Sequence, residues 1–201
     1  MSMASLELDV KKQLCDSAEL KFRIAEELAA ELVEVAFFIA DCFRGGNKLV
    51  LFGNGGSAAD AQHIAGEFVG HLREERKPFP AIALSVNSSV VTALANDYGF
   101  GLVFARQIDA WVRSGDVALG LSTSGRSENV LLGLRRAREL GALTVAFAGG
   151  DGGRLFQVAD KVLVVPSFDT PRIQEGHITM GHIVCDIVEK KLVQNGEEIV
   201  R

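Results

Sequence analysis

Apolar side chains recur at helical spacing through the first 43 residues, a stretch that contains neither Gly nor Pro. Ile24, Leu28, Leu32 and Val35 follow the spacing of one helix face, and the pattern stops at a pair of glycines at 45–46. It predicts one long helix over residues 1–45, or two helices in series. The run VEVAFFIA at 33–40 is apolar on more than one face, so we expect another subunit to cover part of it.

Beyond residue 46, short apolar runs alternate with helical patterns. Continuous apolar runs without polar alternation are typical of strands that are buried on both faces; they lie at 48–52, 81–85, 117–122, 144–148 and 161–166. Helices are expected to begin near Ser57, Ser88, Ser127 and Gly153, and a last one to run from about Pro171 to Gln194. This alternation predicts an α/β fold with a doubly wound parallel sheet. With no linker, repeat or low-complexity tract, residues 1–201 are interpreted as one domain, with an N-terminal helical extension (1–45) and an α/β core (46–201).

Charge and composition exclude several function classes. The net charge is −5 over 201 residues, which argues against nucleic acid as a partner. No apolar stretch is long enough to span a membrane, and the N-terminus does not have the pattern of a secretory signal. Cys15, Cys42 and Cys185 are scattered, which favours reduced, buried thiols. We therefore expect a cytoplasmic protein with no membrane partner.

Two strand ends have residues suited to binding phosphate. The first strand is followed by GNGGSA at 53–58, where glycines let the backbone approach a ligand and the helix that starts at Ser57 offers N–H groups. The loose match to a dinucleotide fingerprint lacks its acidic residue and the Walker lysine is absent, so a turn without a ligand remains an alternative here. The third strand ends in four hydroxyls within six residues, and a helix N-cap explains only one of them: Ser122, Thr123, Ser124 and Ser127.

A metal or acid–base constellation is the third candidate feature. His63, Glu67 and His71 have i, i+4, i+8 spacing on the helix after the first loop. Such a face binds a divalent metal or transfers protons, although a solvated face has the same spacing. The last helix carries four further candidates, and spacing alone does not say which of them points inward: Gln174, Glu175, His177 and His182. Asp97 suits either a sugar hydroxyl or a turn.

Together these segments resemble the sugar isomerase (SIS) domain proteins, and closely the bacterial phosphoheptose isomerases. The residues that carry the resemblance are GNGGSAADAQHIAGEF at 53–68, ANDYGF at 95–100, STSGRSENV at 122–130, GGDGG at 149–153 and RIQEGHITMGH at 172–182. The resemblance implies a five-stranded parallel sheet with flanking helices and a homotetramer with sites between subunits. It also implies interconversion of sedoheptulose 7-phosphate and D-glycero-D-manno-heptose 7-phosphate, an early step toward the heptose of lipopolysaccharide or a related glycan.

The resemblance also assigns roles to individual residues. Glu67 and His182 fall on the catalytic acid–base pair, with Glu67 as the base. One zinc ion per site would be held by His63, Glu67, Gln174 and His182. Substrate contacts are expected from Asn54, Gly55, Gly56, Ser57, Glu67, Asn96, Asp97, Ser122, Thr123, Ser124, Ser127 and Gln174.

One position departs from the family pattern, which often has Gly-Arg where this chain has Gly70-His71. Arg126 and Arg172 are candidates to replace that arginine. Two alternative functions remain: a non-catalytic binding protein of the replication-initiator-associated type, whose members lack the acid and histidine present here at Glu67 and His182, and an isomerase of another sugar phosphate.

Overall fold

The computed structural model describes residues 2–193, so Gln194, the predicted end of the last helix, lies outside the described residues. Five parallel strands form one sheet in the order β2-β1-β3-β4-β5. Their bounds are β1 Leu49–Gly53, β2 Ala81–Ala83, β3 Val117–Ser122, β4 Leu143–Gly149 and β5 Lys161–Val165. The predicted α/β class and five-stranded parallel sheet are confirmed, although β2 ends two residues earlier than expected.

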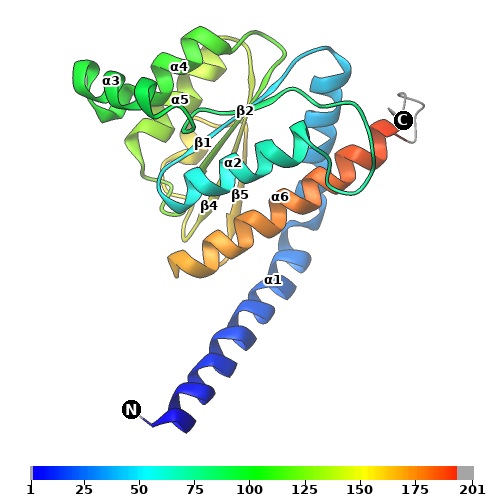
Figure 1. Ribbon diagram of the computed structural model, residues 1–201, viewed down its shortest axis with the longest axis vertical. Helices are drawn as coiled ribbons and strands as arrows, with labels where there is room; N and C mark the ends of the chain where they lie inside the picture. Colours follow the sequence, from blue (N-terminus) through cyan, green and yellow to red (C-terminus); the bar gives the residue numbers. More distant parts are fainter. Residues whose placement is uncertain (1, 194–201) are drawn as a thin grey trace.

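Helices cover both faces of this sheet (Figure 1). α1 (Met3–Arg44), α2 (Gly56–Val69) and α6 (Thr170–Val193) pack on one face; α3 (Ser88–Tyr98), α4 (Val103–Trp111) and α5 (Glu128–Glu139) lie on the other. Successive residues of β1 serve the two cores in turn, since Leu51 belongs to the first and Phe52 to the second. Burial on both faces explains why the strands appear in the sequence as unbroken apolar runs.

Two local predictions were wrong, and one helix was missed. The helix expected at Gly153 is a single 3₁₀ turn, Leu155–Gln157, because Gly152 and Gly153 both have positive φ and stop a longer helix from starting there. Helix α4 was not predicted; it follows a break at Gly99, whose φ is 83°. Cys15 is exposed rather than buried, because α1 is a single helix whose first four turns project from the body of the protein.

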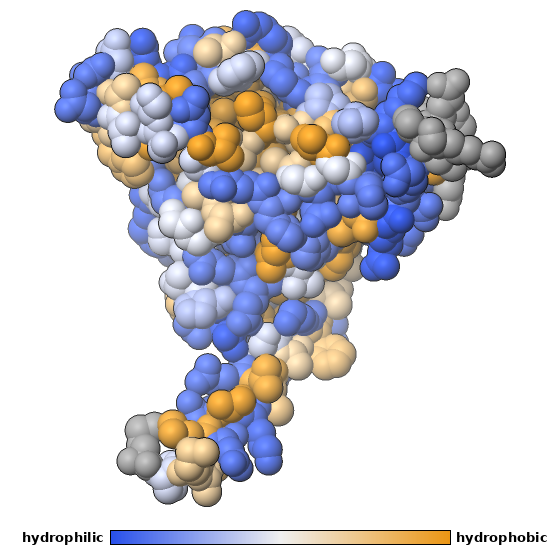
Figure 2. Space-filling view, viewed as in Figure 1, coloured by the Kyte–Doolittle hydropathy of each residue, from blue (hydrophilic) through white to orange (hydrophobic). Residues whose placement is uncertain are grey.

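The projecting part of α1 carries apolar side chains that no other described residue covers (Figure 2). Burial on α1 begins at Ser17 and continues to Phe43. The exposed apolar side chains on this helix are Met3, Leu6, Leu8, Val10, Leu14, Phe22, Val33 and Phe37. None of the described helices is long and apolar enough to cross a membrane.

A buried histidine joins α6 to the sheet. His177 is fully buried, and its Nε2–H donates to the carbonyl of Ala148 at the end of β4, 3.0 Å away. Its Nδ1 is buried without a hydrogen-bond partner among the described residues. Burial lowers the pKa of His177 to about 4, so the imidazole is neutral in the folded protein.

This histidine makes folding stability depend on pH. An unfolded histidine has a pKa of about 6.5, so the unfolded chain binds the extra proton between about pH 6.5 and pH 4. Stability is therefore complete above pH 6.5 and is lost as the pH falls toward 4, by an amount on the order of 3 kcal/mol. We expect His177→Gln, which keeps a donor for Ala148, to remove this part of the pH dependence in denaturant titrations. His71→Gln removes an exposed histidine instead; equal pH slopes in the two variants would contradict the prediction.

Candidate active site

The ends of β1 and β3 lie side by side, where the chain reverses its direction of travel across the sheet. Gly53 of β1 pairs in register with Leu121 of β3, which brings the loops after the two strands together. Asn54 and Asn129 exchange two hydrogen bonds of 2.8 Å across this gap. Ligands of doubly wound sheets bind at such switch points. The switch point between β1 and β3 therefore places both predicted phosphate loops next to each other.

Two hydroxyls of the second loop, those of Ser122 and Ser127, contact each other rather than the helix that follows. Ser122 Oγ donates to Ser127 Oγ at 3.1 Å, and Ser127, although it occupies the N-cap position of α5, makes no side-chain capping bond. Ser57 and Ser122 are buried, Thr123 and Ser127 are half-buried, and Ser124 is exposed. A simple N-cap role does not account for this arrangement, which suits a small anion bound by hydroxyls and N–H groups.

A glycine-rich loop supports the hydroxyl loop from behind. Gly125 has a φ of +63°, and a Cβ there would lie 2.2 Å from the carbonyl oxygen of Gly152. The N–H of Arg154 donates to the carbonyl of Gly125 at 2.9 Å. The backbone of the segment GGDGG at 149–153 thus packs directly against the predicted phosphate loop, and this close approach requires glycine on both sides.

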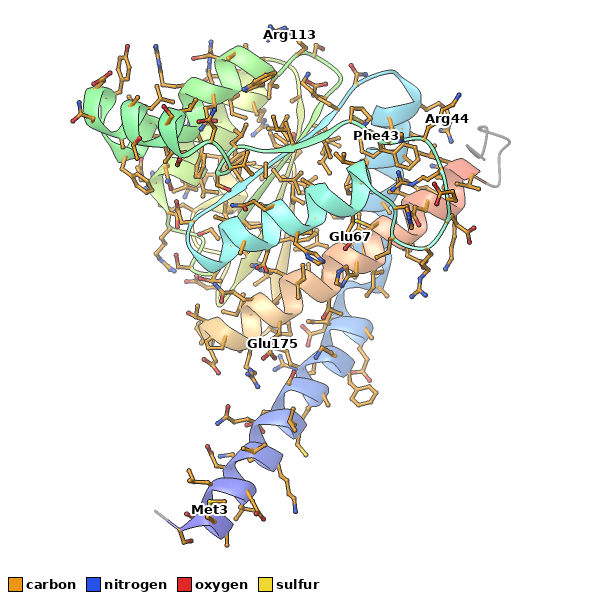
Figure 3. The ribbon with its side chains drawn as sticks, in the orientation of Figure 1. Met3, Phe43, Arg44, Glu67, Arg113 and Glu175 are labelled. Carbon is orange, nitrogen blue, oxygen red and sulfur yellow. The ribbon has the colours of Figure 1, made fainter. Side chains whose placement is uncertain are left out.

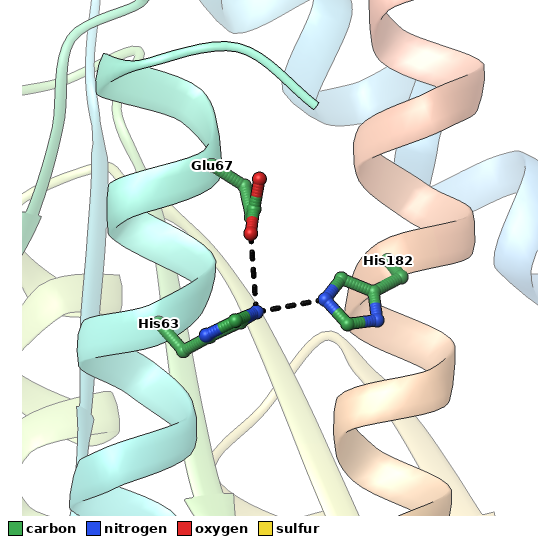
Figure 4. A group of neighbouring side chains, drawn as sticks. All are labelled: His63, Glu67 and His182. Carbon is green, nitrogen blue, oxygen red and sulfur yellow. Dashed lines mark hydrogen bonds and ion pairs between the residues drawn. The ribbon is translucent and has the colours of Figure 1, made fainter. Parts of the chain in front are cut away.

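Helices α2 and α6 pack on the same face of the sheet and bring three predicted metal ligands together. His63 Nε2 lies 2.8 Å from His182 Nε2 and 3.1 Å from Glu67 Oε1, and the three ligand atoms lie within 4.8 Å of one another (Figure 4). His63 and Glu67 come from successive turns of α2, and His182 comes from α6. Two imidazole nitrogens and one carboxylate are a donor set that Zn²⁺ prefers, so the residues present fit the ion.

Gln174, the fourth predicted ligand, lies beside the first residue of α2, away from the cluster. A Cβ on Gly56 would be 2.3 Å from its Nε2. Gly56 precedes His63 by seven residues, or about 10 Å of helix axis. Within one chain the described structure therefore joins Gln174 to the start of α2 and not to the histidines. Glu175 is also apart from the cluster (Figure 3); it accepts hydrogen bonds from Ser17 and Arg172.

Comparison with known proteins agrees with this geometry. Residues 15–149 match the family model of the SIS domain. The phosphoheptose isomerase of Aquifex aeolicus (strain VF5) is 53% identical over 185 residues, which cover 92% of this chain and 97% of that protein. This chain belongs to the phosphoheptose isomerase family.

Solved structures of the family superpose closely on the described fold. The phosphoheptose isomerase of Neisseria gonorrhoeae has a TM-score of 0.87 at 38% identity, covering 92% of this chain and 99% of that one. The phosphoheptose isomerase from Francisella tularensis has a TM-score of 0.89 at 35% identity, covering 94% of this chain and 100% of that one. The predicted catalytic pair, Glu67 and His182, lies in the cluster that α2 and α6 assemble, and its catalytic role stays a prediction.

Other residues that the family resemblance assigned to the substrate are not joined to the cluster within one chain. Asn96 Nδ2 donates to Asp97 Oδ1 at 2.8 Å at the end of α3, which packs on α4 across the sheet from α2 and α6. Their role as phosphoheptose isomerase residues stays a prediction. His71 lies beyond the end of α2 and pairs with Glu75, so it does not join the cluster that its spacing suggested.

The two candidates to replace the usual family arginine have partners of their own. Arg126 lies 2.6 Å from Asp151, whose pKa is lowered chiefly by the hydrogen bond from that guanidinium. Arg172 pairs with Glu175 and donates to the carbonyl of Gln13 on α1. Neither side chain is directed at the cluster by a described contact.

One side chain in this region was not singled out from the sequence. Asp60 lies on α2 between Gly56 and His63, and its Oδ2 is buried without a hydrogen-bond partner among the described residues. Desolvation raises the pKa of Asp60 to about 6, and nearby His63 offsets part of the shift. Its spacing of three residues before His63 is the signal that marks it on the same helix face.

The support behind the phosphate loop is directly testable. Gly125→Ala combines an unfavourable positive φ, which costs about 1–3 kcal/mol, with a backbone clash against Gly152. Gly46→Ala is the matched control, because Gly46 also has a positive φ but nothing lies within 4 Å of a Cβ there. We expect Gly125→Ala to lower the free energy of unfolding more than the control and to weaken binding of inorganic phosphate in calorimetric titration. Unchanged phosphate affinity in Gly125→Ala would separate this loop from the anion.

Proposed function

We propose that this chain is an aldose–ketose isomerase that interconverts sedoheptulose 7-phosphate and D-glycero-D-manno-heptose 7-phosphate. The observation that carries the proposal is the approach of Glu67 and His182, from two helices, in a chain whose strand ends form a phosphate cradle. The phosphate cradle lies at the start of α2 and the cluster on the second half of that helix, since Ser57 precedes His63 by about 9 Å of helix axis. A seven-carbon substrate with its phosphate and carbonyl at opposite ends spans such a separation.

The reaction moves one proton between adjacent carbons. The Glu67 carboxylate takes a proton from C1 of the ketose, and the electron pair of that C–H bond forms the C1–C2 double bond of an enediol while the C2 oxygen gains a proton. Returning the carbon-bound proton to C2, with loss of the proton on the C1 oxygen, yields the aldehyde. The His182 imidazole serves the oxygens, and such general acid–base groups each contribute about 10²–10⁴-fold.

The cluster also suits a zinc ion, one per site. His63, Glu67 and His182 would hold it, and Gln174 would complete the set only from a neighbouring subunit or after a rearrangement. When bound, the ion supplies Lewis-acid polarisation of the substrate carbonyl. Metal binding and proton transfer would compete for the lone pairs of the Glu67 carboxylate.

A homotetramer with sites between subunits completes the proposal. An apolar groove runs between α1 and α6, lined among others by Ile24, Leu32, Val33 and Ile183. Ile183 is the neighbour of His182, so a subunit seated on this groove would also cover the half-exposed cluster. The exposed apolar residues of α1 support the same role for residues 1–45. We place the enzyme in the cytoplasm, at an early step of heptose synthesis for lipopolysaccharide or a related glycan.

The base is tested by Glu67→Gln. We expect turnover of sedoheptulose 7-phosphate to fall by about 10²–10⁴-fold, because the amide cannot accept the carbon-bound proton. Glu74→Gln, in the exposed loop after α2, is the control and should keep wild-type turnover. Full activity in Glu67→Gln would overturn the mechanism. Turnover of a pentulose or hexulose phosphate in preference to the heptulose would favour the alternative isomerase, and no turnover at all would favour the binding-protein alternative.

The metal is tested by removing it. We expect a chelator to lower turnover and added zinc to restore it, because the two histidines and the carboxylate converge on one point. His63→Asn should lose most of the zinc-dependent activity, whereas His71→Asn, which lies outside the cluster, should respond to chelation as the wild type does. Full turnover in metal-free protein would remove the ion from the mechanism.

A further inference from the structure

A second pair of charged side chains is buried beside the cluster but belongs to none of the roles above. The side chains of Arg76 and Glu189 are 2% and 1% exposed. Arg76 Nη2 lies 2.9 Å and Nε 3.0 Å from the same carboxylate oxygen, Oε1 of Glu189. Burying a charge is costly unless the group is paired and its remaining hydrogen bonds are made. The other hydrogen bonds of Arg76 and Glu189 therefore show which parts of the main chain the pair holds in place.

Arg76 completes the C-terminal end of α2. The last carbonyls of a helix have no partner within the helix. Arg76 donates from Nη2 to the carbonyl of Glu67 at 2.9 Å and from Nη1 to the carbonyls of Phe68 at 2.9 Å and Gly70 at 3.1 Å. The guanidinium therefore holds the main chain of the catalytic carboxylate itself.

Glu189, on α6, binds main-chain N–H groups of the loop after α2. Its carboxylate accepts the N–H groups of Leu72 at 2.8 Å and Arg73 at 3.0 Å, in the loop that leaves α2. Glu189 follows His182 by seven residues, two helical turns, so both side chains project from the same face of α6. The loop after α2 is thus attached to the helix that carries the catalytic histidine.

The guanidinium of Arg76 also packs on an aromatic ring. The Arg76 Cζ lies 4.0 Å from the centre of the Phe79 ring. Phe79 stacks on Phe43 at 5.1 Å, and Phe43 meets the edge of Phe68 on α2 at 5.3 Å. The pair is enclosed between α1, α2 and α6, with no freedom to adopt a second arrangement without opening this core.

We propose that Arg76 and Glu189 are positioning residues that set the placement of Glu67 relative to His182 without touching substrate. The inference rests on the proposed isomerisation. Arg76 is anchored to the carbonyls at the end of α2, and Glu189 on α6 is anchored to Arg76 and to the loop that leaves α2. A loosened pair therefore lets α2 shift along α6 and separates the two catalytic groups. The phosphate cradle is built on the ends of β1 and β3 and does not share these contacts.

The test uses Glu189→Gln and Arg76→Lys, with Asp116→Asn as a matched control. Asp116 is equally buried, pairs with Lys48 at 2.6 Å and accepts the N–H groups of Lys48 and Arg113. It directly precedes β3, at the amino end of that strand, and makes no described contact with α2 or α6. We expect all three variants to lower Tm. Only the first two should lower kcat, by about tenfold or more, with KM for sedoheptulose 7-phosphate within about twofold of wild type, because ångström-scale misplacement of catalytic groups is enough for such losses.

Two readouts that need no turnover separate this inference from the proposed function. Zinc affinity, measured by competition with a chelator, should weaken in Glu189→Gln and Arg76→Lys and stay unchanged in Asp116→Asn. Crystal structures of the variants should show a changed distance between His182 and Glu67. Wild-type protein without heptulose turnover refutes the proposed function, and the structures then decide the positioning role. The proposal would be overturned if Arg76→Lys and Asp116→Asn had the same kcat, the same zinc affinity and the same position of His182. If Glu189→Gln does not fold, Arg76→Lys alone serves as the test variant.

Discussion

The close approach of α2 and α6 is the constraint on which the rest of the site depends. Gly181, beside His182, faces Ile64 of α2 so closely that a Cβ there would lie 2.6 Å from its side chain. Five residues earlier on α6, Gly176 allows similarly close contact with Val165 of β5 and Ile24 of α1. Small residues at these positions let the helices pack closely, and their close packing is what brings His63, Glu67 and His182 into one cluster. Any larger separation would leave three unrelated polar side chains on two helix surfaces.

The chain divides recognition and chemistry between different kinds of structure. The proposed phosphate site is built from loops at the ends of β1 and β3, where backbone groups and neutral hydroxyls suit an anion even though the chain has a net charge of −5. The reacting end is built from titratable side chains on helices that pack on a core. Helices are rigid supports, so the distances between Glu67 and its partners depend on packing rather than on loop conformation.

Buried polar groups mark the places where this packing is held. His177 attaches α6 to the end of β4, and Arg76 with Glu189 attaches it to the loop after α2. Both contacts lie within about two turns of His182, on either side of it. The energetic cost of burying these groups is offset by their hydrogen bonds, and the gain is one defined position for α6. Helix α1 belongs to the same layer as α2 and α6, and within one chain part of its apolar surface stays exposed.

Much of this was predictable from sequence because it depends on local patterns. Apolar runs marked the five strands, and the spacing of His63 and Glu67 placed them on one helix face. The hydroxyl-rich strand ends singled out the two loops that the sheet then brings together. The 3₁₀ turn at Leu155–Gln157 and helix α4 were missed, because positive φ at glycines decides them and spacing alone does not reveal backbone conformation. Only the tertiary structure decided that His182 meets His63 while His71, Glu175 and Gln174 point elsewhere, because the selection depends on how two helices more than 100 residues apart in sequence pack together.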